Sequence, residues 1–64
     1  MKFKKITSGL YRANKGNISA EIAKQYISNT WILSMFNELT QELLLNVTLD
    51  KKSNCIEYIT NYNK

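Results

Sequence analysis

Cys55 is the residue that most constrains how this chain can fold, because it is the only cysteine among 64 residues. A lone cysteine cannot close a disulfide within the chain, so a disulfide-stapled secreted mini-protein is excluded. The chain has no histidine, which excludes a zinc site built from nitrogen and sulfur ligands. At this length an unaided core supplies only about 3–5 kcal/mol of stability. We therefore expect one small domain, residues 1–64, that needs a partner chain or a second copy unless its core is unusually well packed.

The lack of histidine also removes the commonest general base at neutral pH. Hydrolases that activate a serine or cysteine through histidine are excluded, and no phosphate-binding glycine loop is present. The remaining acid–base candidates are the carboxylates Glu21, Glu38, Glu42, Asp50 and Glu57. A chain this short offers little concavity in which to raise a carboxylate pKa. We expect a non-enzymatic protein without cofactor or metal.

The composition predicts a cytoplasmic protein. The chain contains no run of apolar residues long enough to span a bilayer, and the basic start is not followed by the apolar segment of a signal peptide. Eight Asn, eight Lys and seven Ile are typical of AT-rich coding, as in low-GC bacteria and their phages and plasmids. We expect no membrane association.

The strongest turn signal lies at Asn14-Lys15-Gly16-Asn17, since Gly and Asn tolerate the positive φ values of a tight hairpin. Residues 6–13 before it are β-tolerant and follow a basic arm, residues 1–5. After it, apolar and polar residues alternate over 18–26, which indicates a half-buried strand. Ser28-Asn29 predicts a second turn.

The second half of the chain predicts two more strands and a helix. Residues 30–36 are rich in large apolar side chains, 37–41 form a polar interval, and 42–49 alternate again. From 51 to 62 apolar residues recur every three or four positions, which indicates a short helix capped by Asp50. The prediction is an α+β fold, an antiparallel three- or four-stranded β-meander packed on one C-terminal α-helix.

A mostly helical chain is the alternative. Residues 19–27 and 38–45 consist of good helix formers, and several apolar residues between Leu33 and Val47 fit a helical stripe. The turn at 14–17, the β-rich segment 30–36 and the regular spacing of turns favour the meander.

The pattern is similar to that of very small proteins carried by phages and mobile elements of Gram-positive bacteria. The matching residues are Ser8-Gly9-Leu10-Tyr11, Trp31, and Thr48-Leu49-Asp50-Lys51-Lys52 leading to Ile56-Glu57-Tyr58-Ile59. The resemblance implies a few strands followed by a helix and an accessory role that alters a host function, of the inhibitor or anti-defence type. It carries over no functional residues. The interval 37–41 lacks the glycine expected of such a meander turn.

A single helix can cover only one face of the predicted sheet. We expect the covered face to use Leu10, Ile18, Ile22, Trp31, Leu33, Leu43, Leu45 and Val47 against Cys55, Ile56 and Ile59. The other face would carry Tyr11, Ala23, Ile32, Phe36 and Leu44. Exposed apolar clusters often mark binding surfaces. The leading hypothesis is that Tyr11, Ile32, Phe36 and Leu44 bind a host protein or a second copy. The alternative is that the chain folds so that these residues are buried within it.

The basic residues suggest a different partner. Lys2, Lys4, Lys5, Arg12 and Lys15 lie in the first quarter of a chain of net charge +4. A sheet with basic rims could follow a phosphate backbone. One arginine offers little base-specific readout. A small DNA- or RNA-binding domain is therefore the second hypothesis, against the simpler interpretation that these lysines are solvated.

Overall fold

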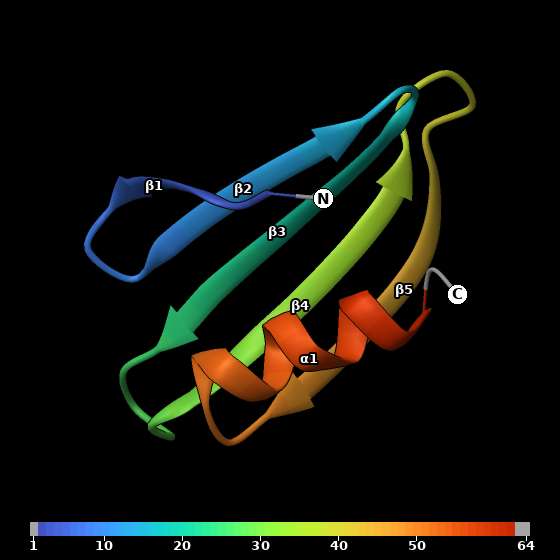
Figure 1. Ribbon diagram of the computed structural model, residues 1–64. Helices are drawn as coiled ribbons and strands as arrows, with labels where there is room; N and C mark the ends of the chain where they lie inside the picture. Colours follow the sequence, from blue (N-terminus) through green and yellow to red (C-terminus); the bar gives the residue numbers. More distant parts are fainter. Residues whose placement is uncertain (1, 63–64) are drawn as a thin grey trace.

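The protein is a five-stranded antiparallel sheet with one helix across it, as a computed structural model describes for residues 2–62. The strands are β1 (Lys4–Thr7), β2 (Leu10–Lys15), β3 (Ile18–Gln25), β4 (Thr30–Asn37) and β5 (Glu42–Leu49), and the helix is α1 (Lys52–Tyr62). The strands lie in chain order, β1-β2-β3-β4-β5, and α1 crosses β3, β4 and β5 on one face (Figure 1). The predicted α+β meander with a C-terminal helix is confirmed, with five strands in place of three or four.

The additional strand is β1, which takes up part of the predicted basic arm. Lys4 and Lys5 pair with Arg12 and Tyr11 of β2, so these two lysines are held in the sheet. The turn between the strands requires Gly9, whose φ is +84°. A Cβ at Gly9 would also meet the Tyr26 hydroxyl. The sequence interpretation missed this turn because it took residues 6–13 as one stretch.

The other turns lie where the sequence predicts them. Gly16, at φ +60°, opens the two-residue loop between β2 and β3, and Asn29 takes φ +55° before β4. The β4–β5 turn has no glycine. Instead the Asn37 side-chain oxygen accepts hydrogen bonds from the backbone N–H groups of Leu39 and Thr40, at 2.9 and 3.3 Å, and Gln41 adopts φ +61°. A side-chain cap and a strained glutamine thus replace the expected glycine.

The helical alternative for residues 19–27 and 38–45 is wrong. Residues 19–25 lie in β3, 38–41 form the β4–β5 turn and 42–45 lie in β5, since pairing and burial in the sheet outweigh local helix propensity. The helix begins one residue later than expected, at Lys52, and the Lys51 carbonyl accepts the first hydrogen bonds, from the N–H groups of Asn54 and Cys55. Lys51 therefore occupies the N-terminal flanking position that the sequence assigned to Asp50.

The core is a thin layer between the sheet and α1. Its buried side chains are Ala20, Ile22, Leu33, Met35, Cys55 and Ile59. Ile22 pairs with Leu33 and Ala20 with Met35 across β3 and β4, which places these four on one face. Phe3, Trp31, Leu45, Val47 and Leu49 are partly buried against them. The core therefore depends on a few large apolar residues between one face of the sheet and a single helix.

Candidate functional site

The sheet face away from α1 carries no covering helix or strand from residues 2–62, and the register shows which side chains lie on it. Residues directly opposite in an antiparallel pair share a face. Ala23 and Ile32 pair with each other, as do Ser19 and Phe36, and all four alternate with buried core residues of β3 and β4. Ile32 and Phe36 thus lie on the uncovered face, as the sequence predicts, and both are half-buried. We call this surface the open face.

Tyr11 is not on the open face, which corrects the sequence assignment. It pairs with Ile22 and packs against the core, with its ring centroid 6.3 Å from that of Trp31. The Lys52 ammonium lies 4.3 Å from the centre of the Tyr11 ring, a cation–π contact from helix to sheet. Tyr11 therefore belongs to the covered layer and drops out of the predicted partner-binding set.

Two further residues exchange faces. Leu10 pairs with Ala23 and so lies on the open face, although the sequence analysis placed it on the face that the helix covers. Leu43 pairs with Phe36 and lies there too, because a register shift follows the pairing of Met35 with Leu45. Leu44 falls at this bulge without a cross-strand partner and is 37% exposed. A bulge inserts one residue and reverses the alternation beyond it.

The open face is mixed rather than uniformly apolar. A polar row crosses it: Lys4, Arg12, Glu21, Ser34 and Asn46 pair in succession from β1 to β5. This row separates Ile32 from Phe36. The structure thus places Phe36 and Leu43 side by side at the β4–β5 end, where Leu43 is 59% exposed, and leaves Ile32 in a separate apolar row with Leu10 and Ala23.

A groove of about 520 Å³ runs along the β1 side of this face. Its lining comes from the N-terminal segment and from strands β1 to β4, and reaches Phe36 and the start of the β4–β5 turn. The residues that line it are Lys2, Lys4, Ile6, Arg12, Ala13, Asn14, Ser19, Ala20, Glu21, Phe36 and Glu38. Ala13 pairs with Ala20 on the covered face, so these two residues border the groove through the sheet backbone, and the small Ser19 side chain leaves room beside Phe36.

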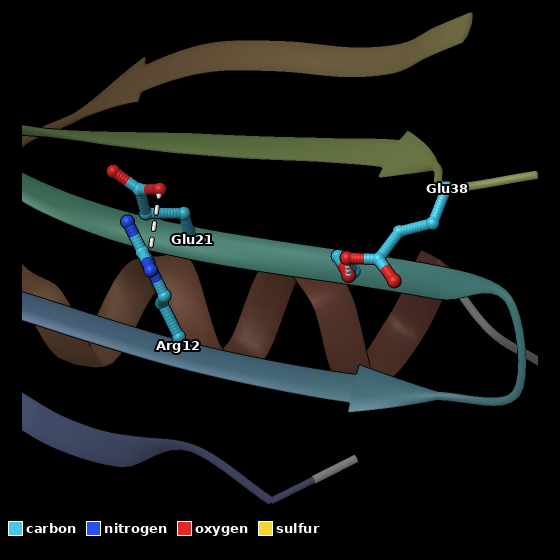
Figure 2. Close-up of polar contacts among 4 residues, drawn as sticks. Arg12, Glu21 and Glu38 are labelled. Atoms are coloured by element: carbon cyan, nitrogen blue, oxygen red, sulfur yellow. Dashed lines mark hydrogen bonds and ion pairs between the residues drawn. The ribbon is translucent and has the colours of Figure 1, made fainter. Parts of the chain in front are cut away.

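Both carboxylates of the groove are engaged by neighbours. The Arg12 Nε lies 3.4 Å from the Glu21 Oε2, and the Ser19 hydroxyl donates a 2.6 Å hydrogen bond to the Glu38 Oε1 (Figure 2). The side chains of Arg12 and Glu21 are 60% and 35% exposed, so this ion pair contributes little stability. Within residues 2–62 it is the one ion pair, which leaves the ammonium groups of Lys2 and Lys4 without a carboxylate.

The structure divides the residues of the nucleic-acid hypothesis between two faces. Lys2, Lys4 and Arg12 line the groove, whereas Lys5 pairs with Tyr11 and Lys15 with Ile18 on the covered side. The Arg12 guanidinium already forms an ion pair with Glu21. No single basic stripe joins the five residues. The hypothesis itself stays a prediction.

Chemistry-bearing groups elsewhere are sparse. No cluster of three potential metal ligands occurs among the described residues, and none of their helices is long and apolar enough to cross a membrane. Cys55 is fully buried on the side of α1 that faces the sheet, as predicted, and this burial raises the pKa of its thiol.

Comparison with known proteins gave no match to a protein-family model, to a curated protein sequence or to a solved structure. The site is therefore defined by its own geometry. Sequence reasoning missed Ile6, Ser19 and Glu38 as groove residues. The two-residue loop at Gly16 would have shown that Ser19 lies opposite Asn14, but Ile6 and Glu38 depend on the undetected β1 turn and on the shape of the β4–β5 turn.

Proposed function

We propose that this chain is a non-enzymatic protein-binding module that docks a partner protein into the open-face groove. The observation that supports this most strongly is the composition of the groove: Ile6 and Phe36 offer apolar contact, while Lys2 and Lys4 form no ion pair with a carboxylate of residues 2–62. Sites of this kind combine an apolar anchor point with a few polar groups that fix orientation.

The charges define the chemistry of the partner. Arg12 pairs with Glu21, whereas Glu38 keeps its charge while it accepts the Ser19 hydrogen bond. Lys2 and Lys4 outnumber this one carboxylate, so the net charge of the groove is positive. The complementary ligand is a peptide segment that places an apolar side chain against Phe36 and carboxylates near Lys2 and Lys4. An acidic, apolar surface segment of a host protein would meet this description. The inhibitor or anti-defence role that the resemblance to small phage proteins implies is part of the same proposal.

A protein partner suits these observations better than nucleic acid. Arg12 is engaged by Glu21, and the other four basic residues are split, with Lys2 and Lys4 in the groove and Lys5 and Lys15 on the covered side. These features support an acidic peptide that can contact Phe36.

Fluorescence anisotropy with labelled probes tests the proposal. The probes are an acidic peptide of alternating Asp and Leu, a basic peptide of alternating Lys and Leu, and a single-stranded oligonucleotide. We expect saturable binding of the acidic peptide alone, weakened at least about tenfold by Phe36→Asp. Ile27→Asp is the control, because Ile27 is fully exposed in the β3–β4 turn, away from the groove. Binding of the oligonucleotide that Phe36→Asp does not affect, or equal binding of both peptides, would contradict the proposal.

A further inference from the structure

The two edges of the sheet are built very differently. An exposed sheet edge presents unpaired backbone groups, and monomeric proteins protect it with short strands, lysines or bulges. The β1 edge has all three: four residues, Lys4 and Lys5, and a register shift before Thr7. The β5 edge is eight residues long and carries no charged residue from Leu43 to Leu49, and its bulge lies near one end.

The backbone groups free at the β5 edge follow from the ladder. The N–H of Glu38 donates a hydrogen bond to the carbonyl of Asn17, its opposite residue just beyond the strand ends. Hydrogen-bonded pairs alternate along an antiparallel ladder, so in β3–β4 they are formed by the odd-numbered residues of β3 and the even-numbered residues of β4. The odd residues of β4 therefore bond to β5, through Leu45, Val47 and Leu49. The backbone N–H and C=O groups of Asn46 and Thr48 consequently point away from β4, outward from the free edge of the sheet.

The covered layer also stays open on this side. On the side toward β1, the Lys52 ammonium lies over the Tyr11 ring of β2 and covers that margin of the layer with a charged group. At β5 the layer ends in Leu45, Val47 and Leu49, which pack on the core and remain partly exposed. A shallow cleft of about 230 Å³ lies beside Leu49, lined otherwise by helix residues Asn54, Glu57, Tyr58 and Asn61.

We infer that the β5 edge is the interface for a second copy of this chain, paired antiparallel to β5 about a two-fold axis between the two Val47 residues. Val47 bonds to β4, so its outer side is a non-hydrogen-bonded position, where side chains of opposing strands approach closely. The axis then places Asn46 opposite the second copy's Thr48, and these residues exchange N–H···O=C bonds in both directions.

This register is self-complementary on both faces of the sheet. On the open face, polar Asn46 faces polar Thr48. On the covered face, Leu45 of one copy lies beside Leu49 of the other, at the cleft that Tyr58 borders. No like charges come opposite each other between Leu45 and Leu49, which contain no charged residue. A second copy therefore matches the edge at every paired position, whereas an unrelated strand would match it only by coincidence. This interface is separate from the groove, so either can fail without the other.

Sedimentation equilibrium of the full chain, from micromolar to millimolar concentration, tests the inference. We expect a monomer–dimer equilibrium whose dissociation constant rises at least about tenfold in Thr48→Pro, because proline removes an N–H that only the second copy uses. Lys5→Pro is the matched control: the N–H of Lys5 points outward at the β1 edge, and dimerisation should persist. Hydrogen exchange of the unmodified chain gives a second readout that does not depend on a proline variant folding. The amides of Asn46 and Thr48 should become protected as concentration rises. A chain that stays monomeric throughout, or a dimer in which these amides remain unprotected, would overturn the inference.

Discussion

At the scale of single residues, Cys55 links stability to pH. Burial raises the pKa of its thiol above the ordinary value of 9.0. The thiol of the unfolded chain ionises near that value, whereas the folded chain keeps it neutral. The contribution to stability is thus complete below about pH 9 and is lost as pH rises through the folded pKa.

We therefore expect the free energy of unfolding to fall above about pH 9 more steeply in the native chain than in Cys55→Ala. Urea titration followed by circular dichroism measures this difference, and the alanine variant is the control for every other source of pH dependence. Equal slopes in the two chains would show that the thiol is accessible to water. A thiol reagent should likewise modify Cys55 only as fast as the chain opens.

At the scale of elements, α1 is attached through a narrow stripe. Its fully buried residues are Cys55 and Ile59, whereas Ile56 is 38% exposed. Ile59→Ala should lower the free energy of unfolding by about 2–4 kcal/mol, most of what a chain of this size has. Ile56→Ala should cost less than about 1 kcal/mol. Thermal and urea unfolding of the two variants compare them directly, and similar losses would mean that the helix is rotated relative to the described packing.

The elements also show how far sequence reasoning reaches. Alternation and turn residues located β3, β4, β5 and the helix, because these signals are local. The face on which Tyr11 lies could also have been predicted from the sequence. A two-residue loop places Lys15 opposite Ile18, which fixes Tyr11 opposite Ile22. The face of Leu43 could not, because the bulge at Leu44 depends on how β4 and β5 fit together and leaves no mark in the alternation.

At the scale of the whole molecule, the fold joins a covered layer to an open face. The groove arises only when β1 lies beside β2 and brings Lys2, Lys4 and Ile6 toward Phe36 from a distant part of the chain. Composition predicted a basic protein that needs a partner, but it could not show that Glu21 would pair with Arg12 and that Glu38 would accept a hydrogen bond from Ser19. Those contacts decide which charges remain for a ligand.

The most direct test of this account compares two adjacent residues, Met35 and Phe36, which lie on opposite faces of β4. Met35 is 2% exposed in the core, so Met35→Asp would bury an unpaired carboxylate and should leave the chain unfolded. Phe36→Asp should fold cooperatively and lose only about 1 kcal/mol, because its side chain reaches water in the groove. Urea unfolding of both variants, monitored by circular dichroism, measures the contrast. If Phe36→Asp is as unfolded as Met35→Asp, Phe36 belongs to the chain's own core and the open face is not a docking surface.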